Sequence, residues 1–197
     1  MTSLVKELSR FDLPALERHF LSLVGEDRRL RFGACVHDLV VCRYVKDIDF
    51  LHDAVFGVLD RDLELIAVAR LGRRDHQAEL GVSVLPGHRH LGIGAALLKR
   101  AHLHARNWGV QELFMYCLAE NGPMMHLARK NGMDIAAASG DADARLNLPP
   151  ADANSHMSAM VEQRIALMDY ALKAQFAGAR RVVDSFAAER LSRDRAT

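Results

Sequence analysis

Apolar residues near the start of the chain recur at the spacing of one helix face, at Leu16, Phe20 and Leu23. Asp12 precedes this run as a helix cap, and Gly25 follows it as a stop, so the pattern predicts a helix. The charged segment 26–33 lacks the periodicity and indicates a turn. A mixed pattern over residues 38–46 predicts a second short helix.

The middle of the chain alternates between short apolar runs and longer helical patterns. The runs rich in Val, Ile, Leu and Ala predict strands at 54–59, 63–71, 79–85, 112–118, 135–139 and 144–148. Helical spacing predicts helices at 92–108 and 121–131. The strands before residue 92 follow one another as antiparallel neighbours, and the helix that starts there is a crossover. The sequence therefore indicates an α/β chain.

Pro149-Pro150 marks a break, and a different pattern begins after it. A helical stripe then runs through Val161, Ile165, Met168, Leu172 and Phe176, and continues with Val182, Val183 and Phe186. We therefore divide the chain into a domain at 1–150 and a helical C-terminal extension at 151–197. A sustained apolar face needs a surface to pack against, which is either the chain's own domain or a second subunit. A homodimer through these helices is one of these two alternatives.

Composition and charge indicate where the protein is located and which classes of partner are not expected. The formal net charge of the 197 residues is +1, and half of them are hydrophobic. This balance gives no reason to expect a nucleic acid or a membrane surface as partner. The three cysteines Cys35, Cys42 and Cys117 form no C-x-x-C pair, so we expect neither disulfides nor structural zinc, and we expect a cytoplasmic location. The chain shows no signal core and no run long enough to span a membrane.

The segment from Val82 to Gly94 has the pattern of a phosphate-binding loop. A strand ends, Pro86-Gly87 turns the chain, and a helix begins at Gly92 and Gly94. A helix N-terminus offers unpaired N–H groups and a partial positive charge, and glycines let a phosphate approach the main chain. Arg89 adds a cation. The dinucleotide and P-loop fingerprints are absent, and the alternative is a helix that merely starts at two glycines.

The wider pattern resembles the acetyl-CoA signature of the GNAT superfamily of N-acetyltransferases. It reads Val84-Leu85-Pro86-Gly87-His88-Arg89-His90-Leu91-Gly92-Ile93-Gly94-Ala95-Ala96-Leu97-Leu98. Asn121 and the segment Leu127 to Met133 resemble the family's next signature, with Met133 in place of Phe. The resemblance covers residues 30–148. It implies a GNAT fold, which is an α+β arrangement with a mixed central sheet of six to seven strands flanked by helices. The helical tail is an addition to it.

The resemblance also implies acetyl-CoA as cosubstrate and no metal. Its expected cofactor-binding residues are Val82, Val84, His88, Arg89, His90, Leu91, Gly92, Ile93, Gly94, Ala95 and Asn121. His102 and His104 are two residues apart on a predicted helix and share no face, so a metal site there is not expected. The implied activity is transfer of an acetyl group to a primary amine by direct attack in a ternary complex. The alternative is a non-catalytic acyl-CoA-binding regulatory module.

Catalytic residues follow from the same resemblance. Glu79 stands on the cofactor strand, where many relatives have a carboxylate base, although a structural salt bridge would also explain it. Relatives often supply the general acid from a Tyr, whose position is Ala128 here, so we consider His126 instead. Cys117 would have to be a thiolate to be acylated, and a buried structural role is favoured.

The acceptor is a small molecule or a protein lysine. The segment 28–32 contains Arg29 and Arg31, in a region that lines the acceptor site of similar bacterial acetyltransferase domains. These arginines are candidates for binding an acidic group on the acceptor. The alternative is a solvated charge cluster.

Overall fold

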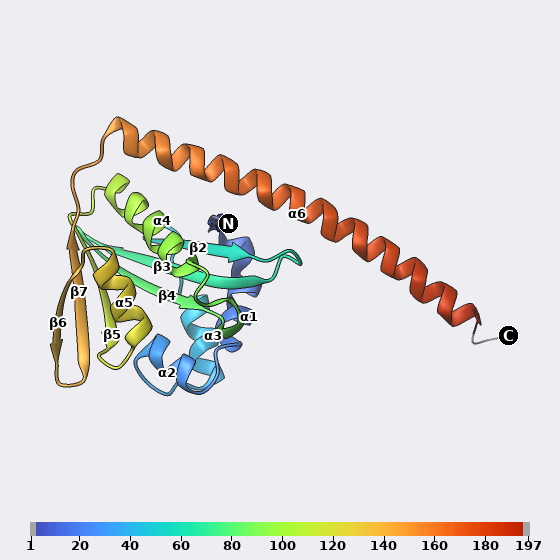
Figure 1. Ribbon diagram of the computed structural model, residues 1–197, viewed down its shortest axis with the longest axis horizontal. Helices are drawn as coiled ribbons and strands as arrows, with labels where there is room; N and C mark the ends of the chain where they lie inside the picture. The colour runs from blue at the N-terminus through green and yellow to red at the C-terminus, as the bar shows by residue number, and fades with distance from the viewer. Residues whose placement is uncertain (1–2, 195–197) are drawn as a thin grey trace.

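The computed structural model describes the backbone of residues 3–194 and the side chains of residues 3–178. One seven-stranded mixed sheet runs in the order β1-β2-β3-β4-β5-β7-β6 (Figure 1). The strands are β1 (Lys6–Leu8), β2 (Asp53–Leu59), β3 (Leu65–Arg74), β4 (Gln77–Val84), β5 (Glu112–Leu118), β6 (Asp134–Ala138) and β7 (Asp141–Asn147). All neighbours are antiparallel except β4 and β5. The mixed central sheet of six to seven strands that the resemblance implies is confirmed.

Helices cover both faces of the sheet. They are α1 (Leu13–Leu21), α2 (Glu26–Phe32), α3 (Asp38–Lys46), α4 (Ile93–Asn107), α5 (Gly122–Lys130) and α6 (Ala153–Asp194), with short 3-10 turns at Arg10–Asp12 and Pro86–His88. Phe20 of α1 and Val41 of α3 are fully buried in one core with Val55 and Val68 of the sheet. Leu97 of α4 is fully buried in the core on the other face. Burial on both faces explains why β2 and β3 consist of apolar runs.

Two elements differ from the sequence-based prediction. Segment 26–33 was expected to be a turn, but it contains α2. Gly25 and Gly33 bound α2 with φ of +52° and +73°, and acidic residues begin it while basic ones end it, as the helix dipole favours. Seven residues with two hydrophobic side chains give no clear periodicity. The strand β1 was missed because its three residues are too few to show an alternating pattern.

The parallel pair β4 and β5 is joined over a short length only. Gln77, Ala78 and Glu79 pair with Glu112, Leu113 and Phe114, and the pairing stops there. β4 continues for five residues and β5 for four residues beyond the last pair. The two strands therefore leave a gap in the middle of the sheet, toward their carboxyl ends.

The helix α6 crosses α4 and then runs on past the rest of the protein (Figure 1). It is 42 residues long. No helix in the described part of the chain is both long and apolar enough to cross a membrane.

Candidate active site

The loop between β4 and α4 has a backbone shape that exposes the start of the helix. Gly92 caps α4 with a φ of +76°, a conformation that glycine adopts easily, and His90 also has a positive φ of +61°. The N–H groups of Ile93, Gly94 and Ala95 donate to no acceptor among the residues that the structure describes. A Cβ built on Gly92 would have no atom within 4 Å, so the space above the helix start is open. This geometry suits a phosphate group.

A cavity of about 670 Å³ opens over this loop and extends into the gap between β4 and α5. We call it the donor cavity. Of the cofactor residues expected from the sequence, it is lined by Val82, Val84, His88, Arg89, His90, Gly92, Ile93, Gly94, Ala95 and Asn121. Leu91 is the exception, because it does not line the cavity and its side chain is 62% exposed. The structure thus brings ten of the eleven residues together.

The charge of the donor cavity is mainly positive. Lys130 of α5 lines it together with Arg89, and Asp27 of α2 is the acidic residue in the lining. Asp27 Oδ1 lies 2.7 Å from Arg89 Nη2, and Arg89 Nε donates to the carbonyl of Val84 at 3.1 Å. Asp27 and Lys130 were not found from the sequence. Lys130 lies one helical turn after His126 and Leu127, which also line the cavity, and this spacing was the available signal.

Asn121 lies in the lining, but its side chain has structural contacts. Its Oδ1 accepts a hydrogen bond from the Met124 N–H at 3.2 Å, which caps α5, and its Nδ2 is 3.5 Å from the Leu30 carbonyl. The side chain thereby fixes the first turn of α5 and connects it with α2. Its contact with a coenzyme stays a prediction.

A second cavity, of about 590 Å³, lies on the sheet face that carries α2 and α3. We call it the acceptor cavity. Its lining comes from α2, α3, α5 and four strands, and includes Glu79, Gly81, Tyr44, Tyr116, Cys117, Asp141 and Asp143. The two cavities share Leu30, Arg31, Val82 and Met124. Both therefore meet where β4 and β5 separate.

Arg31 lies at this junction and is held by aromatic rings. Its Nη2 donates to the Tyr44 hydroxyl at 2.6 Å, and its guanidinium lies 5.2–5.3 Å from the ring centres of Phe20, Phe32 and Tyr44. A Cβ on Gly81 would come within 2.8 Å of Arg31 Nη2. The glycine in the middle of β4 therefore gives the guanidinium its place against the strand.

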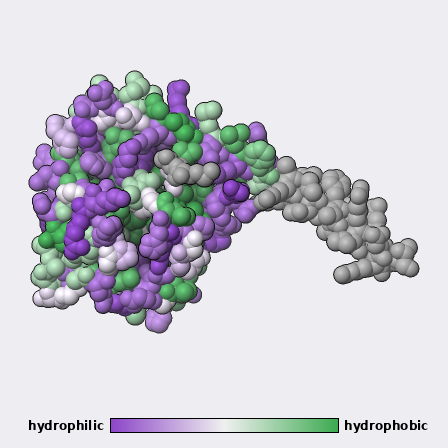
Figure 2. Space-filling view, in the orientation of Figure 1, coloured by the Kyte–Doolittle hydropathy of each residue, from purple (hydrophilic) through white to green (hydrophobic). Residues whose placement is uncertain are grey.

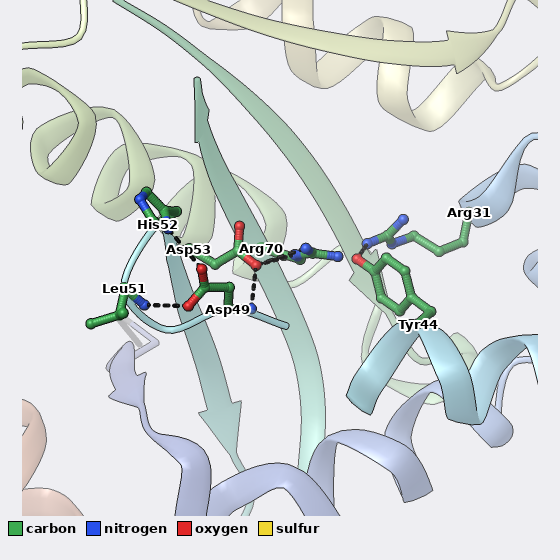
Figure 3. Close-up of polar contacts among 7 residues, drawn as sticks. All are labelled: Arg31, Tyr44, Asp49, Leu51, His52, Asp53 and Arg70. Atoms are coloured by element: carbon green, nitrogen blue, oxygen red, sulfur yellow. Dashed lines mark hydrogen bonds and ion pairs between the residues drawn. The ribbon is translucent and has the colours of Figure 1, made fainter. Parts of the chain in front are cut away.

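Tyr44 lies between two guanidinium groups (Figure 3). Arg31 donates to its hydroxyl from one side, and Arg70 of β3 stacks 4.8 Å from the ring centre on the other. Arg70 also binds Asp53 Oδ2 at 2.7 Å. Burial lowers the pKa of Arg70, but Tyr44 and Asp53 raise it by more, so its net shift is upward. Because the hydroxyl oxygen accepts from arginine, its own hydrogen is directed elsewhere. Tyr44 was not singled out from the sequence.

The acceptor cavity contains three carboxylates, those of Glu79, Asp141 and Asp143. Asp143 Oδ2 accepts from Arg145 at 3.2 Å, whereas its Oδ1 is buried without a hydrogen-bond partner among the described residues. No ion pair or hydrogen bond engages the Glu79 side chain within the described part of the chain. Burial, and then Asp143 and Asp141, raise the pKa of the Cys117 thiol. This shift disfavours a Cys117 thiolate, and therefore its acylation.

Two candidate residues lie away from the acceptor cavity. Arg29 lines neither cavity, because its guanidinium pairs with Glu26 at 2.8 Å and also with Glu120. These bonds tie α2 to the loop before α5. His126 is exposed and lines the donor cavity only. In the described part of the chain, no three His, Cys, Asp or Glu residues gather in a way that could hold a metal ion.

A buried histidine supports the floor of the donor cavity. His19 of α1 is bonded at 2.8 Å both to the Leu65 carbonyl, through Nδ1, and to the Ser83 hydroxyl, through Nε2. Burial lowers the pKa of His19 to about 4. The neutral ring donates to the carbonyl and accepts from Ser83, so it fixes a residue that lines the cavity.

Several solved structures share the fold of this chain. The GNAT domain of PAT from S. lividans is 21% identical, with a TM-score of 0.64 over 73% of this chain and 89% of that one. Ribosomal-protein-alanine N-acetyltransferase from Brucella melitensis is 22% identical, with a TM-score of 0.60 over 74% and 99%. YncA, a putative acetyltransferase from Salmonella typhimurium with acetyl-CoA, is 16% identical, with a TM-score of 0.59 over 78% and 98%.

The sequence itself matches a family. No curated protein matches the chain. The model of the acetyltransferase (GNAT) family matches residues 24–133, which is more than half of the chain. The matched segment includes the loop between β4 and α4, the four residues that line both cavities, and α5. This protein therefore belongs to the GNAT family of acetyltransferases.

Proposed function

We propose that this protein transfers an acetyl group from acetyl-CoA to a primary amine by direct attack in a ternary complex. The observation that carries the proposal is the junction of two cavities of opposite charge where β4 and β5 separate. The donor cavity has free N–H groups at a helix start and a surplus of cations, which fits the phosphates of a coenzyme. Bound acetyl-CoA would supply the activated acetyl group.

Glu79 is the proposed general base. An amine must lose a proton as it attacks, and a carboxylate within reach accepts it directly or through water. Glu79 lines the acceptor cavity, beside the junction, and no described residue engages its carboxylate. Its position on the paired part of β4, opposite Phe114, keeps it on a rigid strand.

The leaving thiolate needs a proton donor. His126 remains the residue proposed from the sequence, and it lines the donor side. Tyr44 is a second candidate, because arginine donates to its oxygen and it lines the acceptor side. His126→Gln and Tyr44→Phe separate the two. The variant that loses turnover while its affinity for acetyl-CoA stays unchanged identifies the proton donor. Full turnover in both variants would refute both candidates.

The acceptor cavity favours an amine that carries positive charge near the reacting nitrogen. Three carboxylates line it, and one of them has a buried oxygen without a partner. An ammonium group or a second amine would satisfy that oxygen, whereas an acidic acceptor would be repelled. We therefore propose a diamine, or a lysine side chain beside another cationic residue, as the acceptor class, in place of an acidic acceptor held by Arg29 and Arg31.

Calorimetry with acetyl-CoA, followed by thiol release across a panel of amines, tests the proposal. We expect binding, and turnover that is fastest with cationic diamines or lysine peptides. Binding without turnover on any amine would favour the alternative, a regulatory module that binds acyl-CoA. Absence of binding at millimolar acetyl-CoA would refute both. The division of the chain at residue 150 and the cytoplasmic location stay predictions.

A further inference from the structure

The helix α6 has two faces of opposite character, and its polar face is the one against its own domain. Gln163 accepts a hydrogen bond from Arg100 at 3.1 Å, and Lys173 donates to the Leu59 carbonyl at 3.0 Å. Between them Ala166 is only 3% exposed. The domain therefore contacts α6 through polar and small side chains and the ring of Tyr170, which lies 4.6 Å from Lys6 Nζ.

The start of α6 is also fixed to the end of α4. Arg106 binds Asp152 at 2.6 Å and the Pro150 carbonyl at 2.9 Å. Asn107 exchanges hydrogen bonds with Ser155, whose hydroxyl donates to it at 2.6 Å. These contacts set the rotation of the helix about its axis, so the outward direction of its other face is determined by the fold.

The outward face carries a stripe of large apolar residues. They are Met157, Val161, Ile165, Met168, Leu172 and Phe176, and each is between 46% and 71% exposed. Figure 2 shows hydrophobic residues on the helix just before the grey segment. A contiguous apolar face of this kind on a protein surface marks an interaction site.

The spacing of the stripe points to another helix as its occupant. Met157 and Met168, Val161 and Leu172, and Ile165 and Phe176 are each eleven residues apart. Eleven residues make just over three whole turns, so the stripe stays nearly straight along the helix axis. A straight, regular stripe fits the seam between two helices.

Two polar residues on the outward face indicate whether the partner helix runs parallel or antiparallel to α6. Arg164 and Gln175 are exposed, and they too are eleven residues apart. In a parallel pair of identical helices, two Arg164 guanidiniums would face each other in the seam and repel. In an antiparallel pair centred between Asp169 and Tyr170, Arg164 lies opposite Gln175 of the other copy, whose amide oxygen can accept from it.

Few cations border the stripe within the part of α6 whose side chains the structure describes. A helix that lies on anionic lipid carries several Lys or Arg residues along its polar flanks. Among the described outward residues of α6, Arg164 is the one such cation, and Lys173 is bound on the domain side by Asp169 at 2.7 Å. We propose that α6 is a dimerisation helix, on which a second copy of this chain packs its own stripe in antiparallel orientation.

The molecular mass of the full chain in solution tests the proposal. Sedimentation or light scattering should give a dimer, and Met168→Lys with Leu172→Lys should weaken association at least about 100-fold. Leu51→Glu is the matched control, because Leu51 is 82% exposed but lies outside α6. Circular dichroism and acetyl-CoA binding check that each variant folds. A monomer at about 100 µM wild-type chain, or a dimer that survives both lysines, overturns the proposal.

Cysteine cross-linking tests the orientation. The exposed Cys35 is replaced by Ser, and this chain alone gives the background from Cys42 and Cys117. In an antiparallel pair, Arg164→Cys and Gln175→Cys chains should cross-link when mixed, and neither should cross-link alone. Self-cross-linking of the Arg164→Cys chain would overturn the antiparallel arrangement. A monomeric chain that binds vesicles of phosphatidylglycerol and phosphatidylcholine would overturn the dimer in favour of a membrane.

Discussion

The donor and acceptor cavities meet at four residues, but they are built in different ways. The donor cavity takes nearly half of its lining from one stretch of the chain, residues 82–95, and offers main-chain N–H groups at the start of α4. The acceptor cavity takes its lining from residues on α2, α3, α5 and four strands. A ligand recognised through main chain depends on backbone shape, whereas one recognised through side chains can change with single substitutions. The four predictions below test this contrast.

The largest effect is expected from Gly92→Asp. The substitution places a side chain where φ is +76°, and adds a negative charge at the helix start. Calorimetry should show acetyl-CoA binding weakened at least about 100-fold. Gly109→Asp is the matched control, because Gly109 has a φ of +75° but follows α4 at its other end. Equal loss in both variants would mean that strain, rather than the loop, is responsible.

Glu79→Gln tests the acceptor side at the carboxylate proposed as the general base. The amide cannot accept the proton of the attacking amine, so we expect kcat to fall by about 100-fold. Affinity for acetyl-CoA should not change, because Glu79 does not line the donor cavity. Glu112→Gln serves as control, since Glu112 pairs with Arg145 outside both cavities. Unchanged kcat in the Glu79 variant would remove Glu79 from the mechanism.

Asp143→Asn tests whether the acceptor cavity favours amines with a second positive charge. We expect KM for a cationic diamine to rise by about tenfold, with a much smaller change for an amine that has no second charge. Steady-state kinetics at low and high salt measure both. Asp134→Asn is the control, because Asp134 is exposed on β6 and does not line the cavity. Equal changes for both amines would contradict the proposed acceptor class.

Asp27→Asn should have the smallest effect, and in the opposite direction. The carboxylate of Asp27 neutralises Arg89 inside the donor cavity, so its removal frees that cation for a phosphate. We expect acetyl-CoA to bind about threefold more tightly, as measured by calorimetry. The exposed Asp47 supplies the control variant, Asp47→Asn. Weaker binding in Asp27→Asn would show that the pair positions Arg89 for the ligand.

The same contrast explains what the sequence could and could not predict. Nearly every strand and helix was placed, because apolar periodicity is a local signal. The donor loop was found because its glycines and Arg89 are contiguous. Tyr44, Asp143 and Lys130 were missed because they come together only in the folded chain, where no local pattern marks them. The pairing of Arg29 with Glu120 could not be predicted for the same reason, since the two residues are far apart along the sequence.

The early end of the pairing between β4 and β5 leaves a strand edge inside the sheet. Beyond Glu79 and Phe114, alternate backbone N–H and C=O groups of both strands have no neighbouring strand to bind. Hydrogen exchange should therefore be fast at amides that face the gap and slow when a ligand with amide groups lies between the strands. A ligand that pairs with these groups would extend β4 as an additional strand, and slower exchange of the facing amides would report its binding.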